Sequence, residues 1–134
     1  MKQFLRFATV GVLLFVLDAG FFSAMLRIGC PVVVSRVTAV CVAIFASWLV
    51  NRNWTFRGAQ APKDASVREF LKFAATQALG AGVNTLVSLF AYGFAVVAAF
   101  GPWAAVAAGS AAGLMVNFIG AKYLVFNRVE RPLP

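Results

Sequence analysis

The sequence predicts an all-α integral membrane protein with four transmembrane helices, and three observations lead to that fold class. Of the 134 residues, 62% are hydrophobic and only 12% are charged, and the mean hydropathy is +0.87. Soluble domains carry about a quarter charged residues, and a chain of this length could not bury so much apolar surface within itself. The apolar residues also form long segments, and the basic residues lie at the ends of those segments.

Four segments are long enough to cross a bilayer, which takes about 20 mainly apolar residues. We expect spans at Phe7–Leu26, Val32–Val50, Phe73–Val97 and Trp103–Leu124. The short joints "RIGCP" (27–31) and "AFGPW" (99–103) contain the Gly and Pro that are typical of turns. The longer, polar joint "RGAQAPKDAS" (57–66) lies at the midpoint and divides the chain into two halves.

The basic residues predict the orientation of these spans. Ten of the twelve Lys and Arg residues precede the first span, lie between the second and third, or follow the fourth. Only Arg27 and Arg36 fall on the other side. By the positive-inside rule, both termini and the middle joint are cytoplasmic. Because the net charge of +8 is spread over these segment ends and forms no single patch, we expect no nucleic-acid partner.

The two halves resemble each other in sequence. "QFLRFA" (3–8) and "EFLKFA" (69–74) match almost residue for residue at an offset of 66. Later in each half the offset becomes 70, which pairs Arg52 with Lys122 and Phe56 with Phe126.

We therefore interpret residues 1–134 as one membrane domain made of two repeats, residues 1–57 and 68–128. Each repeat has two spans, so both repeats enter the membrane from the same side and form a parallel repeat. Transporters are often built from repeats, with the binding site where the repeats meet.

Small residues recur every four positions along the second span of each half. Small residues at this spacing let helices approach closely in lipid. We expect close packing from the first two residues of each series and a further role for the polar residues near its end. The series are Ala39, Ala43, Ser47 and Asn51 in the first half, and Gly109, Gly113, Asn117 and Ala121 in the second.

Three motifs together resemble the GtrA-like family of membrane proteins: "FLRFATVG" (4–11) with Asp18 beyond it, "SWLVNRNWTF" (47–56) and "VNFIGAKYLVF" (116–126). The resemblance covers nearly the whole chain. It implies a small four-span protein of the bacterial cytoplasmic membrane that flips a polyprenyl-phosphate-linked monosaccharide, for the glycosylation of cell-envelope polysaccharides.

The family's helix ends resemble Asn-x-x-x-Asn-Arg-x-Trp-x-Phe, and the two halves depart from this pattern differently. The first half has Ser47 in place of the first Asn. The second half keeps Asn117 but has Ala121, Lys122 and Leu124 in place of the second Asn, the Arg and the Trp. These departures predict that the two halves have unequal roles.

Asp18 is the only acidic residue within any predicted span, and Asn84 occupies the matching position of the second half. A carboxylate in the membrane is costly unless it is paired, hydrated or protonated, so Asp18 is a functional candidate. It could hydrogen-bond sugar hydroxyls, or exchange a proton because burial disfavours the charged form. The alternative is a structural hydrogen bond to Asn84 or Asn117.

The remaining candidates lie near the ends of the spans. Arg52 and Lys122 could meet a lipid phosphate at the cytoplasmic ends of the second helices, although snorkelling cations are also common there. Arg36 could receive the phosphate on the opposite side. Trp54 could stack on a sugar or belong to the interfacial aromatic belt. The complete set of predicted substrate-binding residues is Asp18, Arg36, Asn51, Arg52, Trp54, Asn84, Asn117 and Lys122.

The sequence predicts a protein that is not an enzyme and binds no metal or cofactor. It has no histidine, no paired carboxylates and no phosphate-binding loop, and its two cysteines stand apart.

Three functions compete. The first is the flippase, whose partners are membrane lipid and the lipid-linked sugar. Because four short helices enclose little space, it needs a lateral groove or a homodimer, and we expect a homo-oligomer, with a dimer favoured. The second is a proton-coupled exporter like the small multidrug-resistance proteins, which also have four spans and one acid in the first. The third is a non-transporting anchor for a glycosyltransferase partner.

Overall fold

The computed structural model describes residues 1–57, 65–94 and 102–126, and these residues fall into two units. Residues 1–57 belong to unit 1, and the described residues from 65 onward belong to unit 2. Most of the middle joint, part of the second turn and the basic residues Lys63, Arg128 and Arg131 lie outside the described residues.

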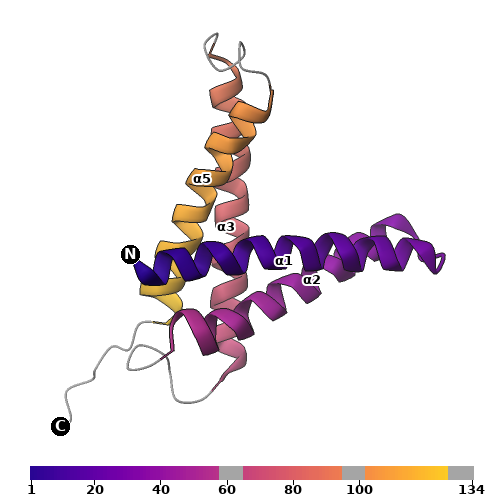
Figure 1. Ribbon diagram of the computed structural model, residues 1–134, viewed down its shortest axis with the longest axis horizontal. Coiled ribbons are helices and arrows are strands. Elements are labelled where there is room, and N and C mark those ends of the chain that lie inside the picture. Colours follow the sequence, from indigo (N-terminus) through magenta and orange to yellow (C-terminus); the bar gives the residue numbers. More distant parts are fainter. Residues whose placement is uncertain (58–64, 95–101, 127–134) are drawn as a thin grey trace. The chain divides into compact units, whose positions relative to one another are not determined.

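Unit 1 is a pair of long helices that lie side by side, as Figure 1 shows. Helix α1 spans Lys2–Arg27 and helix α2 spans Val32–Val50, and the π-helical segment η1, Asn51–Thr55, continues α2 without a break. In the turn between the helices, Gly29 has a φ of +85°, a left-handed conformation that glycine adopts without steric cost.

Unit 2 is a second helix pair. Helix α3 spans Val67–Tyr92 and helix α5 spans Pro102–Gly120, and the π-helical segment η2, Ala121–Val125, continues α5 (Figure 1). The side chain of Ser66 caps α3, because its hydroxyl accepts a hydrogen bond of 3.1 Å from the backbone N–H of Glu69.

Two predicted spans are shifted relative to the helices. Helix α1 begins at Lys2 and not Phe7, while α3 begins at Val67 and not Phe73. The prediction counted apolar residues only, whereas the Ser66-x-x-Glu69 pattern is a helix-start signal that admits charged residues in the first turns. Helix α3 ends at Tyr92, and the expected continuation to Val97 lies outside the described residues.

The four-span all-α fold class is confirmed. Within the described residues, four helices are long and apolar enough to cross a membrane: Lys2–Arg27, Val32–Thr55, Val67–Ala91 and Ala104–Val125. The cytoplasmic placement of the termini and the parallel repeat stay predictions.

The same aromatic contact occurs in each unit. The rings of Phe7 and Phe56 have centroids 6.1 Å apart in unit 1, and those of Phe73 and Phe126 are 6.0 Å apart in unit 2. All four side chains are buried. These are the phenylalanines that the offsets of 66 and 70 bring into register, so the contact supports the repeat interpretation.

Both units also end their second helix in a π-helical turn, which the sequence did not lead us to expect. The N–H of Phe56 donates to the carbonyl of Asn51, and that of Phe126 donates to the carbonyl of Ala121, each at 2.9 Å. Such turns are rare and are frequent at functional sites. The "NRNWTF" motif and its counterpart "AKYLVF" therefore share a backbone shape as well as a position.

Candidate functional site

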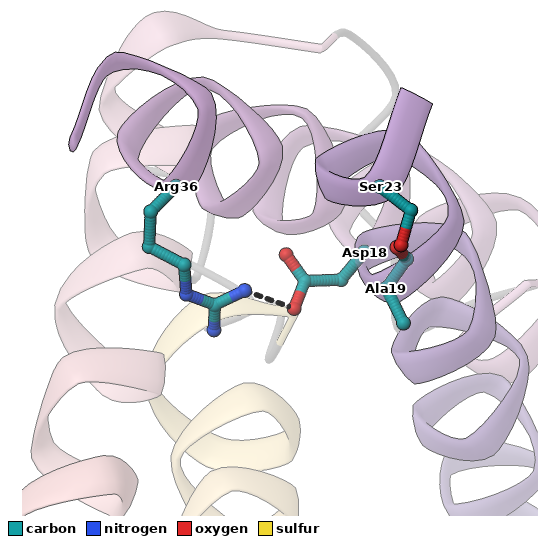
Figure 2. A network of polar contacts seen from close by, with 4 residues as sticks. All are labelled: Asp18, Ala19, Ser23 and Arg36. Atoms are coloured by element: carbon teal, nitrogen blue, oxygen red, sulfur yellow. Dashed lines mark hydrogen bonds and ion pairs between the residues drawn. The ribbon is translucent and has the colours of Figure 1, made fainter. Parts of the chain in front are cut away.

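An ion pair lies between the two helices of unit 1. Arg36 of α2 donates from Nη1 to the Oδ2 atom of Asp18 on α1 at 2.7 Å, as Figure 2 shows. The guanidinium carbon of Arg36 also lies 5.7 Å from the ring centroid of Phe22. The Asp18 side chain is 16% exposed and that of Arg36 is 53% exposed. The acid is thus the more enclosed partner.

The second carboxylate oxygen of Asp18 is not used by the ion pair. Oδ1 is buried and has no hydrogen-bond partner among the described residues. The nearby hydroxyl of Ser23 is directed to its own helix, where it donates to the carbonyl of Ala19 at 2.8 Å (Figure 2). A carboxylate oxygen accepts hydrogen bonds only, so Asp18 offers one acceptor site to a donor such as a sugar hydroxyl.

Sequence reasoning considered Asp18 and Arg36 separately and missed their pairing. It predicted that Asp18 binds a sugar hydroxyl or exchanges a proton, and that Arg36 binds a phosphate. The signal was present, because the one acid in a span and a cation on the next helix are separated by a single short turn. A pairing of opposite charges within the membrane is the usual outcome for such residues.

Unit 2 has a groove lined by amide and hydroxyl groups, with a volume of about 270 Å³. Asn117 Oδ1 is buried there and has no hydrogen-bond partner among the described residues, while Asn84 Oδ1 accepts from Ser88 at 3.2 Å. The groove is lined by Gln77, Gly80, Ala81 and Asn84 of α3 and by Ser110, Gly113, Leu114 and Asn117 of α5.

The groove depends on close approach of α3 and α5. A Cβ atom at Gly113 would lie 2.7 Å from the carbonyl oxygen of Gly80 and 2.9 Å from Asn84 Cβ. A Cβ at Gly109 would collide with Asn84 and Ser88. The close-packing prediction for Gly109 and Gly113 is therefore confirmed. The structure adds Gly80 and Gln77 to this site, neither of which the sequence singled out.

Asn51 lies in a buried network within unit 1. Its side-chain amide donates to the carbonyl and hydroxyl oxygens of Ser47 at 3.0 and 3.2 Å, and its Oδ1 accepts from Thr55 at 2.7 Å. The residue is 1% exposed. Its amide holds α2 to the π-helical turn, which favours a structural role over contact with a ligand.

The other predicted residues lie at the ends of the second helices. Arg6 donates to the carbonyl of Trp54 at 3.4 Å, and its guanidinium carbon lies 5.8 Å from the Trp54 ring centroid. Lys122 Nζ lies 4.9 Å from the ring centroid of Tyr123. Arg52, like Lys122, is half-buried. Cations beside aromatic rings can still turn part of their surface to a phosphate.

Within the described residues, no three His, Cys, Asp or Glu side chains are grouped so that they could hold a metal ion.

The sequence profile of one family, the GtrA/DPMS transmembrane domain, matches residues 6–129. The chain belongs to this family. The match confirms the resemblance that the span-end motifs suggested, and with the four long apolar helices it identifies a multi-pass membrane protein. Membership of this family suggests a membrane flippase. No curated protein matches the chain.

Proposed function

We propose that this protein moves a polyprenyl-phosphate-linked monosaccharide across the bacterial cytoplasmic membrane, for the glycosylation of cell-envelope polysaccharides. The observation that carries the proposal is the amide-lined groove of unit 2, in which the buried oxygen of Asn117 has no partner among the described residues. The polyprenyl chain stays in the bilayer, so the protein needs a polar surface for the sugar alone.

The groove suits a sugar in both chemistry and size. Amides and hydroxyls can donate to and accept from sugar hydroxyls, and polar groups buried without partners are costly to keep. A volume of about 270 Å³ is near the lower end of the range of about 300–1,000 Å³ for small-molecule sites. Such a groove fits one sugar residue better than an oligosaccharide.

The charged residues of the proposal have separate roles. In unit 1, we infer a separate role for the Oδ1 atom of Asp18, as an acceptor for a hydroxyl of the substrate. Arg36 fixes that carboxylate in place. Arg52 and Lys122 contact the lipid phosphate at the ends of the second helices, where the two repeats match in charge.

The ion pair counts against the exporter alternative. Proton-coupled exporters of cations need a carboxylate that their substrate can approach, and in this protein Arg36 already occupies one side of Asp18. The anchor alternative predicts that no residue in either unit affects sugar translocation. A homodimer and a glycosyltransferase partner stay predictions.

Reconstitution in liposomes tests the proposal. The purified protein is placed in vesicles with polyprenyl-phosphate hexose, and access to the sugar from the opposite leaflet is measured. We expect Asn117→Ala to slow translocation about tenfold, since one hydrogen bond in a desolvated site has about that effect. Met115→Ala, on the same helix and 49% exposed, is the matched control. Wild-type vesicles without translocation would favour the anchor, and equal rates for both variants would exclude Asn117 from the site.

A further inference from the structure

Unit 2 has a second groove, which no role described above explains. It has a volume of about 370 Å³ and is lined by Lys72, Ala75, Thr76 and Leu79 of α3 and by Leu124 of η2. Its walls are mainly apolar, and Lys72 is the one charged residue among those named. Leu79 is 59% exposed and Leu124 is 64% exposed, so the groove opens to the surroundings of the helix pair.

The corresponding place in unit 1 is occupied differently. Lys72 matches Arg6 at the offset of 66, and Leu124 matches Trp54 at the offset of 70. In unit 1 the indole of Trp54 lies against Arg6, whose guanidinium also donates to the Trp54 carbonyl. In unit 2 a smaller leucine replaces the indole. Lys72 forms no ion pair with a carboxylate of the described residues. The Trp-to-Leu difference thus leaves both a cation and an apolar surface for an added molecule.

We propose that this groove binds an anionic phospholipid of the surrounding bilayer, with its phosphate at Lys72 and one acyl chain along Ala75, Leu79 and Leu124. The charge of Lys72 and the apolar walls match the two parts of such a lipid. Lys72 immediately precedes the apolar run that begins at Phe73, so its ammonium group lies at the depth where phosphates meet hydrocarbon.

This lipid site is separate from the proposed sugar groove. Lys72 and Asn84 are twelve residues apart on α3, about 18 Å along the helix axis. One sugar cannot contact both residues at once, and competition with polyprenyl phosphate separates a phospholipid from the phosphate of the substrate, which is assigned to Lys122, two residues from Leu124. The proposal therefore stands whether or not the protein moves a lipid-linked sugar.

The test measures lipid binding to the full-length protein in detergent, by native mass spectrometry during titration with phosphatidylglycerol or phosphatidylcholine. We expect phosphatidylglycerol to bind about fivefold more tightly, because one lysine near a lipid phosphate contributes about that factor. Lys72→Gln should remove the preference. Leu124→Trp should fill the groove as Trp54 does and weaken the binding of both lipids, whereas Leu89→Trp, on a 69% exposed position of α3, should not.

A reciprocal variant keeps the test independent of any folding defect in unit 2. Trp54→Leu should open the matching groove beside Arg6 and add a second bound phosphatidylglycerol. Unchanged binding in Leu124→Trp and in Trp54→Leu would overturn the proposal. The proposal would also be overturned if polyprenyl phosphate displaced phosphatidylglycerol at a lower concentration than that of the bound phosphatidylglycerol. The occupant would then be the lipid carrier of the proposed substrate.

Discussion

The two units have the same arrangement of helices but different polar side chains. Both have a long helix pair, a buried phenylalanine pair and a π-helical turn after the second helix. Unit 1 places an ion pair between its helices, and a Cβ added at Gly11 or Gly20 would meet nothing within 4 Å. In unit 2 the matching position holds Asn84 in place of an acid, and four glycines, Gly80, Gly109, Gly113 and Gly120, press against the neighbouring helix. The two units therefore have similar helix pairs but different polar residues.

Contacts that occur in both units define the fold, whereas contacts that occur in one unit can serve a separate function. The aromatic pair and the π-helical turn occur twice, so they define the repeat. Among the described residues, the ion pair of Asp18 with Arg36 lies in unit 1, and the amide groove with the unpartnered Asn117 oxygen lies in unit 2. We infer that the halves are not interchangeable. Four sets of substitutions test that inference, in order of decreasing effect.

The largest effect is expected where the glycines of α5 pack against α3 in unit 2. Gly113→Leu should destabilise the protein by about 3 kcal/mol, because its Cβ would overlap the backbone of Gly80, which cannot move aside as a side chain can. Gly82→Leu is the matched control on α3, where an added Cβ meets nothing within 4 Å. It should be neutral or slightly stabilising, since glycine is a poor helix former.

Yield of folded protein and denaturant titration in detergent micelles measure both variants. A Gly113→Leu protein as stable as Gly82→Leu would mean that α3 and α5 do not touch at Gly113. The comparison between the units would then lose its main packing difference.

The second test breaks the ion pair of unit 1. Arg36→Ala should cost about 2 kcal/mol, because it leaves the enclosed Asp18 carboxylate without its partner. Asp18→Asn combined with Arg36→Ala should cost clearly less than the sum of the two single changes, Asp18→Asn and Arg36→Ala. A double-mutant cycle on the free energy of unfolding measures this coupling. Strict additivity would show that the two side chains do not interact in the membrane.

The third test copies unit 2 into unit 1. Asn51→Ala should cost about 1.5 kcal/mol, since Thr55 loses the acceptor of its buried hydroxyl. Ala121 and Val125 occupy the matching positions of unit 2. The double variant Asn51→Ala with Thr55→Val should therefore recover most of the loss, because no buried hydroxyl is left unpaired. A double variant less stable than the single one would mean that the π-helical turn of unit 1 requires its polar network.

The sequence was sufficient for the fold class because the determining signals are long and additive. Four apolar runs and their basic flanks predict four spans without any knowledge of packing. The start of α3 was missed because one cap, Ser66, outweighs several charged residues in a first turn. The π-helical turns were missed because no residue type in Asn51–Thr55 requires a wider helix, and the same turn forms from Ala121–Val125.

The candidate site was less predictable, because it depends on which side chains pair. Asp18, Asn84 and Asn117 could be named from their rarity inside apolar segments. The single short turn between Asp18 and Arg36 favoured Arg36 as the partner of Asp18, but the choice between Arg36 and the asparagines also depends on the relative rotation of helices. Gln77 and Gly80 carry no signal of their own, and they line the groove only because glycine packing brings α3 and α5 together.

The smallest expected effect tests what the units share. Phe56→Leu and Phe126→Leu each remove one ring of a matched pair, at centroid distances of 6.1 and 6.0 Å. Both residues are 0% exposed. Each change should cost about 1 kcal/mol, the typical value of an aromatic contact beyond its burial. Because the two contacts have the same place and nearly the same distance, the two costs should agree within about 0.5 kcal/mol. Phe15→Leu, at a 71% exposed position of α1, provides the baseline for losing a ring outside such a pair. Denaturant titration of the three variants in one detergent gives the comparison. If Phe56→Leu and Phe126→Leu differed by more than 1 kcal/mol, the aromatic pair would belong among the features that diverged, and the repeat would rest on backbone shape alone.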